Sequence, residues 1–451
     1  MSTAHPVIIV GGGLSGLAAA VELTAAGIPV LLLEQKPALG GRAYSFRDPT
    51  TGDTVDNGQH VLIAGYERTF RFLSTIGTVH RLKVQPTLQM TFHHPQRGFQ
   101  SFYLAALPPP LNILTGVLRT SLFSWADRIR LLRAGISLYA PHIQDRIDTW
   151  TIEEWLDSVG QSPEVKRSFW ELLAVSIMNE HIDAASAATF VRSLRVAFLG
   201  HWRNAALAIP TVGLSELYVE GAREYLSSRG AAVRCNTDVV SVIEAGGIAK
   251  GVMLRSGDQL HCTALILAVP AHRVGSLLAQ AVPDLAIPDL GSSPIVSVHL
   301  WFPHDPMEHE VVGLVGRRVQ WLFNRRKLLQ GGGKGGHLSA VISAADDFAG
   351  LSNEELTRLA VEDIQSAYPA TPAEPSHAVV VRERRATYRP RPANERLRPD
   401  QRTPIPNLAL AGDWTATGYP ATIEGAVISA ERSVAIVMEW LGHLRPGSPG
   451  M

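Results

Sequence analysis

The sequence predicts an α/β protein in which a Rossmann-like nucleotide-binding domain is interleaved with a second domain of mixed sheet plus helices. Two stretches carry this prediction. An apolar strand pattern at residues 7–10 leads through a glycine-rich turn and an alanine-rich helix to a second apolar strand at residues 30–33. Near the other end of the chain, an apolar strand at residues 408–411 precedes another alanine-rich helix. We therefore expect a nucleotide-binding domain assembled from separated segments.

The patterns between these two stretches suggest how the domains divide. A helix-rich middle runs from about residue 110 to 200, and strand patterns follow, including buried-looking ones at residues 265–269 and 295–302. The expected division is a nucleotide-binding domain of residues 1–80, 205–290 and 395–445, a second domain of residues 81–204 and 291–394, and a tail of residues 446–451. The glycine-rich run at residues 331–336 lacks the spacing of a phosphate-binding loop, so we interpret it as a surface loop.

The composition narrows the functional classes. The chain has 451 residues, of which 46% are hydrophobic, with 41 basic and 41 acidic side chains. A formal net charge of zero argues against nucleic-acid binding, which draws on a strongly basic face. Because the only cysteines are Cys235 and Cys262, a disulfide framework is excluded and a reducing, cytoplasmic compartment is expected. The 16 histidines show no metal-ligand spacing, so no metal site is predicted.

The turn after the first strand fits the pattern G-x-G-x-x-G. Gly11 permits the tight turn, Gly13 lets a pyrophosphate approach the backbone, and Gly16 allows the helix to pack closely on the strand. The N–H groups at the start of the helix, at Leu14 and Ser15, have no partner within the helix and would face phosphates. In this strand–turn–helix context the pattern predicts a dinucleotide site.

An acidic residue at the end of the second strand indicates which dinucleotide the site would bind. Glu34 is placed to accept hydrogen bonds from an adenosine ribose, and an acid there disfavours the 2′-phosphate of NADP. The following Gly40-Gly41-Arg42 resembles the FAD proteins of the amine oxidase and phytoene desaturase superfamily. The resemblance implies a fold of the GR2, or amine-oxidase, type in which Arg42, beside Gly41, reaches the diphosphate of FAD.

The same resemblance covers two later segments. It implies that Gly412 and Asp413 lie at the ribityl chain, and that the backbone opening the last helix, at Ile423 and Glu424, faces the flavin pyrimidine carbonyl. It also implies that the backbone of Val239 touches adenine. Because neither cysteine lies near the C-terminal segment, FAD is expected to bind noncovalently.

Three segments resemble a narrower family. They are DNGQHVL from residue 56, FWEL from residue 169, and the stretch from GDWT to EGA over residues 412–426. They look like those of the squalene-associated FAD-dependent desaturases, the hydroxysqualene dehydroxylases of bacterial hopanoid pathways. The resemblance implies an isoprenoid lipid substrate and reduction of hydroxysqualene to squalene and water. Loss of the allylic hydroxyl would leave a delocalised cation that a hydride from reduced flavin quenches, and an external reductant would recharge the flavin.

Such a reaction needs a proton donor in a dry apolar tunnel. His60 is our candidate for a proton donor or orienter near the flavin, because a neutral pKa suits general acid work. The competing interpretation is that His60 only hydrogen-bonds a turn. Tyr388 is a weaker candidate, expected to be a strand residue.

Three other functions fit the same superfamily. A carotenoid-type desaturase, acting on a phytoene-like substrate, would use the same fold and flavin in the oxidising direction. A flavin amine oxidase would need an aromatic cage, which Trp414 and Tyr419 supply only in part. A prenyl-lipid escort of the Rab-GDI type would lack the flavin, and the presence of Glu34, Arg42 and Asp413 argues against it.

A lipid substrate makes a pair of predicted helices relevant. They cover residues 111–123 and 124–139, and Ser124, with Asp127 three residues on, is expected to cap the second helix. Both helices are amphipathic and carry Arg119, Arg128, Arg130 and Arg133 with a single acid. Such helices lie in a membrane interface, although they are equally typical of ordinary packing. The uncharged stretch before them contains three adjacent prolines, which argues against a spanning helix. We expect a cytoplasmic protein, peripheral on the inner face of the membrane.

Overall fold

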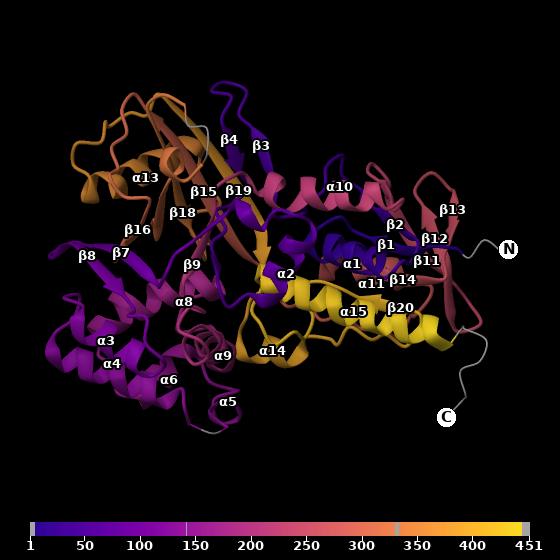
Figure 1. The fold of residues 1–451 in the computed structure, drawn as a ribbon, viewed down its shortest axis with the longest axis horizontal. Helices are drawn as coiled ribbons and strands as arrows, with labels where there is room; N and C mark the ends of the chain where they lie inside the picture. The colour runs from indigo at the N-terminus through magenta and orange to yellow at the C-terminus, as the bar shows by residue number, and fades with distance from the viewer. Residues whose placement is uncertain (1–4, 141, 330–332, 444–451) are drawn as a thin grey trace.

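The fold is described from a computed structural model that covers residues 5–140, 142–329 and 333–443 (Figure 1). The predicted tail at 446–451 and two residues of the glycine-rich run, 331 and 332, lie outside the described residues. A parallel sheet with its helices forms one part of the molecule, on the right of Figure 1. A mixed sheet and a helical body form the other part, on the left.

The parallel sheet is built from the strands that the sequence indicates. Its order is β10-β2-β1-β14-β20, and all neighbours pair in parallel. The strands are β1 (Val7–Val10), β2 (Val30–Leu33), β10 (Ala232–Arg234), β14 (Ala264–Leu267) and β20 (Leu408–Leu410). Four of them are buried along their whole length, which explains why they read as continuous apolar runs and not as alternating ones.

Each face of the parallel sheet is covered by a different layer. Val7 and Ile9 of β1 pack in one cluster with residues of α1 (Leu14–Ala25), α10 (Gly221–Ser228) and α15 (Ile423–His443). Ile8 and Val10 point to the opposite side, because successive residues of a strand face opposite ways. There they meet the sheet of β11 (Val239–Ala245), β12 (Ile248–Leu254) and β13 (Gln259–His261), together with α11 (Ala271–Leu278).

The second sheet has seven strands in the order β19-β15-β18-β17-β16-β7-β8. In chain order they are β7 (Gln89–His94), β8 (Gly98–Tyr103), β15 (Ser293–Phe302), β16 (Val311–Leu314), β17 (Trp321–Asn324), β18 (Gly336–Ile342) and β19 (His377–Thr387). One face packs under α13 (Asn353–Ala367) through a cluster that includes Val298 of β15. The neighbouring residues, Ser297 and His299, face the other way, toward the segment that follows the hairpin of β3 (Ser45–Arg47) and β4 (Thr54–Asp56).

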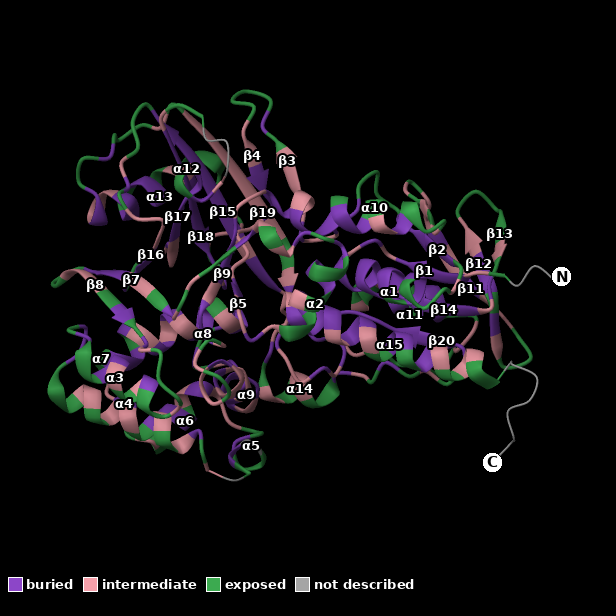
Figure 2. Ribbon diagram, viewed as in Figure 1, coloured by how far each residue is buried: buried purple, intermediate pink, exposed green. Residues whose placement is uncertain are grey.

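The helical body confirms the predicted helix-rich middle. It contains α3 (Leu111–Arg119), α4 (Trp125–Ser137), α5 (Ile143–Arg146), α6 (Ile152–Ser158), α7 (Pro163–Val165), α8 (Glu171–Met178) and α9 (Ala187–Phe198). The Ser124 hydroxyl accepts a hydrogen bond from the N–H of Asp127 and caps α4, as the sequence indicates. Figure 2 shows buried residues along both sheets, and exposed residues over α3 and α4. Within the described ranges, no helix is both long enough and apolar enough to cross a bilayer.

Short elements connect these parts. They are β5 (Leu62–Ile63), α2 (Glu67–Thr75), β6 (Leu82–Val84), β9 (Leu207–Pro210), α12 (Arg325–Leu328) and α14 (Pro392–Leu397). β9 pairs with β5 and β6, so residues from the first and middle thirds of the chain share a small sheet between the two parts.

Candidate functional site

A pocket of about 830 Å³ opens at the carboxyl ends of the parallel strands. The residues that follow four of the strands all line it: Gly11 after β1, Glu34 after β2, Ala268 after β14 and Gly412 after β20. In open parallel sheets, ligands bind at this edge. The volume is at the upper end of the range of about 300 to 1,000 Å³ that is typical of small-molecule sites.

The glycine-rich turn forms one wall of this pocket. Gly11 has φ +108°, and a Cβ there would come within 2.3 Å of the Ala268 carbonyl oxygen. A Cβ on Gly16 would lie 1.9 Å from the carbonyl oxygen of Gly11, so both positions require glycine for packing. A Cβ on Gly13, in contrast, would meet nothing closer than 3.9 Å, because this glycine borders the pocket itself.

The start of α1 is open toward a ligand. Gly13 is its N-cap residue, and no side chain caps the helix. The backbone N–H groups of the first turn therefore remain for a ligand, and Leu14 and Ser15 line the pocket. Ser15 itself is turned away, since its hydroxyl donates to the carbonyl of Ala426 at 3.0 Å. This arrangement suits a pyrophosphate.

Glu34 lines the pocket beside the glycine-rich turn. One carboxylate oxygen accepts from the N–H of Gly12 at 2.7 Å, and the other accepts from the N–H of Lys36 at 2.8 Å. These bonds fix the carboxylate at the pocket edge beside the glycine turn. Val239, the first residue of β11, lines the same end of the pocket.

At the opposite end of the pocket, segments from the first and last parts of the chain meet. The Arg42 guanidinium donates to Asp413 Oδ1 at 2.7 Å and to the Ala386 carbonyl at 2.5 Å. The charge of Asp413 raises the pKa of Arg42. Gly41, Gly412 and Asp413 all line the pocket here. The structure therefore brings together the segments that the sequence singled out.

The two residues nominated at the start of α15 face different ways. Ile423 lines the large pocket. The Glu424 carboxylate points to the other side of the helix, where it accepts from the hydroxyl of Thr69 at 2.6 Å and from two N–H groups at the start of α2. Burial raises the pKa of Glu424. The Glu424 side chain is therefore not turned toward the large pocket.

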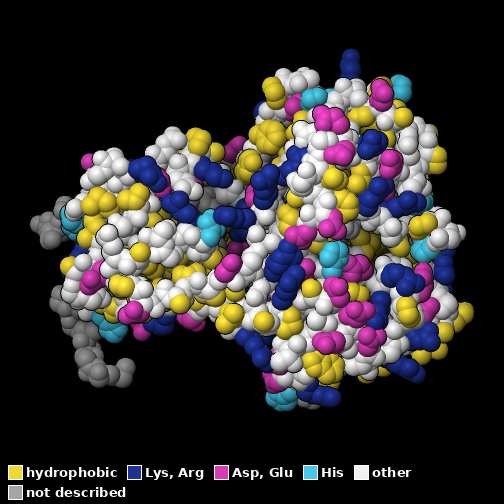
Figure 3. Space-filling view, turned by 180° about the vertical axis from the view of Figure 1, so that it is seen from behind, with side chains coloured by type: hydrophobic (Ala, Val, Ile, Leu, Met, Phe, Trp, Pro, Cys, Tyr) yellow, Lys and Arg dark blue, Asp and Glu magenta, His cyan; other side chains and the backbone are white. Residues whose placement is uncertain are grey.

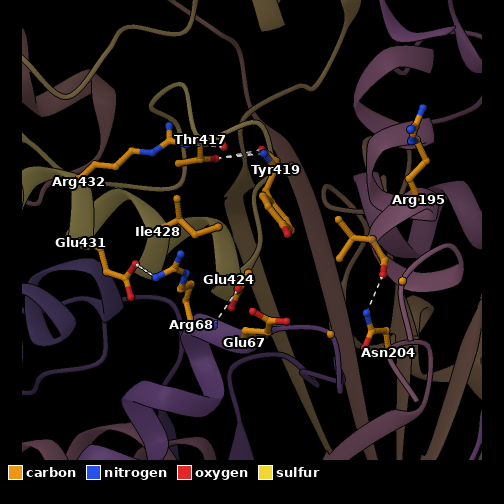
Figure 4. A pocket seen from close by; sticks show the side chains of 13 residues that line it. Glu67, Arg68, Arg195, Asn204, Thr417, Tyr419, Glu424, Ile428, Glu431 and Arg432 are labelled. Carbon is orange, nitrogen blue, oxygen red and sulfur yellow. Dashed lines mark hydrogen bonds and ion pairs between the residues drawn. The ribbon is translucent and has the colours of Figure 1, made fainter. Parts of the chain in front are cut away.

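Glu424 instead lines a second pocket, of about 540 Å³, between α2, α9 and α15 (Figure 4). Charged side chains surround it, with Glu67 and Glu424 on one side and Arg195 on the other. So polar a lining suits neither a hydrocarbon nor a flavin ring.

His60 also lines the large pocket. Its Nδ1 lies 2.9 Å from the carbonyl oxygen of Gly58, so this contact, which the competing interpretation expects, is present. Burial lowers the pKa of His60, the Gly58 carbonyl and the nearby Asp56 oppose that effect, and Arg42 adds to it. The net effect lowers the pKa and so favours the neutral form of the imidazole at the pocket wall.

The expectation that Tyr388 is a strand residue is wrong. β19 ends at Thr387, because its partner β15 begins at Ser293, which pairs with Thr387. The Tyr388 hydroxyl donates to Glu395 at 2.7 Å, and its ring lies under the guanidinium of Arg398. Tyr388 still lines the pocket, and burial raises its pKa well above the usual value.

Sequence reasoning missed Arg398. Its guanidinium is buried and bonds to the carbonyl oxygens of Asp413, Thr415 and Tyr419, which shapes the loop after β20. Arg398 is one of several arginines in a proline-rich stretch, and no periodic signal there could have pointed to this role.

Comparison with known proteins agrees with this geometry. The profile of the flavin-containing amine oxidoreductases matches residues 14–438. The chain belongs to this family. Relatives named hydroxysqualene dehydroxylase in Sinorhizobium fredii and Rhodopseudomonas palustris are each 30% identical, over 96% of this chain and 98% of theirs. The chain therefore also belongs with this narrower group. A 15-cis-phytoene desaturase of Synechococcus elongatus is 23% identical over 98% of both chains.

Solved structures share the fold. An oxidoreductase from Methanosarcina mazei superposes with a TM-score of 0.71 at 17% identity, covering 96% of this chain and 100% of its own. Cyclohexylamine oxidase from Brevibacterium oxydans gives 0.65 at 18% identity, covering 97% and 100%. The amine-oxidase type of fold is thereby confirmed.

FAD is the cofactor of this flavoenzyme family, and the pocket fits it. The uncapped helix start and the open side of Gly13 accommodate a pyrophosphate, and Arg42 offers a charged donor. Neither cysteine is among the pocket residues of the described chain, and burial raises the pKa of Cys262 to about 12. This agrees with noncovalent binding.

Proposed function

We propose that this protein reduces hydroxysqualene to squalene. The balanced reaction is R–OH + FADH₂ → R–H + H₂O + FAD, where R–OH is the allylic alcohol. The observation that carries the proposal is the match over nearly the whole chain to three curated hydroxysqualene dehydroxylases, at 29 to 30% identity. The chain also supplies a pocket that suits the cofactor of such a reaction.

The residues that would hold FAD are those of the large pocket. The backbone N–H groups of Leu14 and Ser15 would bind the pyrophosphate, Glu34 would face the ribose, and Val239 the adenine. Arg42 and Asp413 would hold the diphosphate and ribityl region. Bound and reduced, the cofactor supplies a hydride.

His60 would move the proton in this scheme. Loss of the allylic hydroxyl as water needs one proton, and His60 is the histidine of the described chain that lines the pocket on the side of Arg42. Because burial lowers its pKa, a protonated His60 would be a strong donor. His60→Gln should lower turnover at least tenfold with FAD still bound, whereas near-normal turnover would assign the proton to another group.

A desaturase acting on a phytoene-like substrate is the alternative with specific support. Phytoene desaturases match at 23 to 26% identity, below the dehydroxylases. The two functions differ in direction, since a desaturase removes hydride from its substrate. The deciding experiment incubates dithionite-reduced enzyme with hydroxysqualene, and oxidised enzyme with phytoene, both anaerobically. Squalene identified by mass in the first reaction supports the proposal, and desaturated product in the second would overturn it.

The proposal extends to the membrane surface as the source of substrate. Two helices on the side away from the parallel sheet, α3 and α4, carry many exposed residues (Figure 2). These include large apolar side chains that lie near arginines in the sequence. The exposed set is Leu111, Leu114, Leu118, Trp125, Ile129, Ile136 and Tyr139. Seen from behind, the helical part of the molecule shows hydrophobic side chains interspersed with Lys, Arg, Asp and Glu (lower right of Figure 3). Exposed apolar side chains beside arginines, as on α3 and α4, are typical of interfacial helices.

A squalene-length lipid has negligible solubility in water, so an enzyme that acts on it needs access to a bilayer. We propose docking on the cytoplasmic face through α3 and α4, where anionic lipids would attract the arginines. The reduced cofactor must be regenerated after each turnover, so the scheme also requires an external reductant.

A further inference from the structure

One ion pair is completely buried where the β3–β4 hairpin meets the second sheet. Arg325, the first residue of α12, places Nη2 at 2.7 Å from Asp56 Oδ2, and both side chains are 0% exposed. The same guanidinium donates through Nη1 to the Gln59 side-chain oxygen at 2.5 Å. The other oxygen of Asp56 accepts from the Ser45 hydroxyl at 2.6 Å and from the N–H of Leu214 at 3.1 Å.

These contacts determine the course of the segment 56–60, which ends at His60. From one side, Arg325 contacts Asp56 and Gln59, the first and fourth residues of this segment. From the other side, the Asn57 amide donates to the Arg42 carbonyl at 3.0 Å and to Glu383 at 3.3 Å. His60 follows directly and lines the cofactor pocket. The imidazole is therefore carried by a segment that polar contacts fix on both sides.

We propose that Arg325 and Asp56 are positioning residues for His60. Arg325 fixes the backbone that carries the imidazole, and Asp56 sets the charge beside it. The proposal rests on the proposed role of His60 as proton donor. A fully buried ion pair is an expensive way to gain stability, because desolvation opposes its attraction, and apolar residues of similar size often serve as well. A role in positioning a functional group explains why a buried ion pair is present here, whereas a contribution to stability alone does not explain it.

The next residue of α12 provides a matched comparison. Arg326 bonds to both oxygens of Asp53, each at 2.7 Å, and so also ties α12 to the hairpin. This pair is partly exposed, at 13% and 19%, and none of its contacts involves residues 56–60. A substitution of Arg326 therefore shows what loosening α12 from the hairpin does without disturbing a contact to residues 56–60.

The charged surroundings give the sign of the electrostatic effect. Asp56 and Arg42 are the charged groups that act on His60, and the Asp56 charge raises the pKa of that imidazole. Arg325, His299 and Tyr218 face Asp56. Replacing Asp56 by asparagine removes this negative charge and leaves the positive charge of Arg42, so the change disfavours a protonated His60.

The test compares four variants of the FAD-loaded protein: Asp56→Asn, Arg325→Lys, Gln59→Met and, as the control, Arg326→Lys. A donor is active when protonated, so the rate falls as pH rises through the pKa of His60. Asp56→Asn should move this limb of the kcat profile to lower pH by about one unit. Arg325→Lys keeps the charge but cannot bond Asp56 and Gln59 together. It should lower kcat at least tenfold with KM within twofold and the limb unmoved.

Gln59→Met removes only the hydrogen bond between Arg325 and Gln59, and it should also lower kcat. This variant keeps the proposal testable if a variant of the buried ion pair fails to fold. Arg326→Lys should stay within twofold of the native protein. The proposal is overturned if Arg325→Lys and Gln59→Met behave like Arg326→Lys. A titration of His60 by NMR with labelled histidine, in holoprotein without substrate, separates this inference from the proposed function. The Asp56→Asn shift should appear there even if hydroxysqualene is not the substrate.

Discussion

The Arg42 guanidinium lies 2.7 Å from the Asp413 carboxylate, which joins positions 371 residues apart in the chain. Arg42 follows the first β-α-β unit, and Asp413 follows the last strand of the same sheet. The pair lies at the end of the pocket where the two nominated segments meet. Its formation therefore depends on correct assembly of the parallel sheet from distant parts of the chain.

Arg42→Ala should weaken FAD binding. A hydrogen bond to a charged group contributes about 1.5–3 kcal/mol, which corresponds to a loss of roughly 10- to 100-fold in affinity. Flavin content after purification and fluorescence titration of the apoprotein with FAD measure this loss. Arg47→Ala is the control, because Arg47 bonds only to Gly52 of its own hairpin and does not line the pocket. Equal affinity of both variants would contradict the role of Arg42.

Two glycines of the first turn should respond differently to alanine. Gly13→Ala places its Cβ in the open pocket with φ at −72°, so the fold should persist while FAD affinity falls at least tenfold. Gly16→Ala forces a Cβ to 1.9 Å from the carbonyl of Gly11, and overpacking of this kind costs about 1–3 kcal/mol of folding free energy. Thermal unfolding of the apoproteins, with FAD titration, tests both. A Gly13→Ala variant that binds FAD normally would be inconsistent with the pyrophosphate site.

Buried histidines predict that the protein loses stability in acid. Burial, reinforced by Arg325, lowers the pKa of His299 to about 4, and burial also lowers the pKa of His337. Between pH 6.5 and 4 the unfolded chain then binds more protons, so the free energy of unfolding falls as pH falls. Each such residue contributes up to about 1.4 kcal/mol per pH unit in this window.

Denaturant unfolding at pH 8, 6 and 5 measures this slope. His299→Gln should show a shallower dependence than the native protein, whatever its stability at pH 8. Replacing the exposed His80 by glutamine should leave the slope unchanged. An identical slope in the native protein and His299→Gln would rule out His299 as a source of the acid sensitivity.

Local patterns in the sequence predicted individual strands and a helix cap. β1 and β2 were recognisable because strands buried on both faces read as unbroken apolar runs. The cap at Ser124 was recognisable because its partner Asp127 lies three residues away. The convergence of Arg42 and Asp413 followed only from the resemblance to a known superfamily.

The parts that were missed depend on tertiary partners. Arg325 and Arg398 each lie close to other arginines in the sequence, and nothing in the local pattern distinguishes the buried arginine from its solvated neighbours. Tyr388 directly follows β19, but the end of a strand depends on the extent of its partner, and the antiparallel partner β15 begins at Ser293 opposite Thr387. The resemblance assigns only the backbone of Glu424 to the flavin, and nothing in the local sequence pattern indicates that its carboxylate bonds to Thr69.

Removing the exposed apolar side chains of α4 should weaken membrane docking. Trp125, Ile129 and Ile136 are 67%, 55% and 70% exposed, so replacing all three by serine leaves the core intact. Burial of such a side chain contributes about 1.5–3 kcal/mol, so the triple variant should bind vesicles at least tenfold more weakly. Cosedimentation with anionic phosphatidylserine-containing vesicles measures this. Leu397→Ser, at a 56% exposed site on α14, is the matched control.

The arginines of α3 and α4 add a second expectation to the same experiment. Attraction between Arg119 or Arg128 and anionic headgroups is screened by salt, whereas apolar insertion is not. The native protein should therefore bind anionic vesicles more weakly as salt rises, and the triple variant should lose its remaining binding entirely at high salt. If the triple variant binds as well as Leu397→Ser at every salt concentration, the bilayer is approached through another surface. The apolar face of α4 would then need a different explanation.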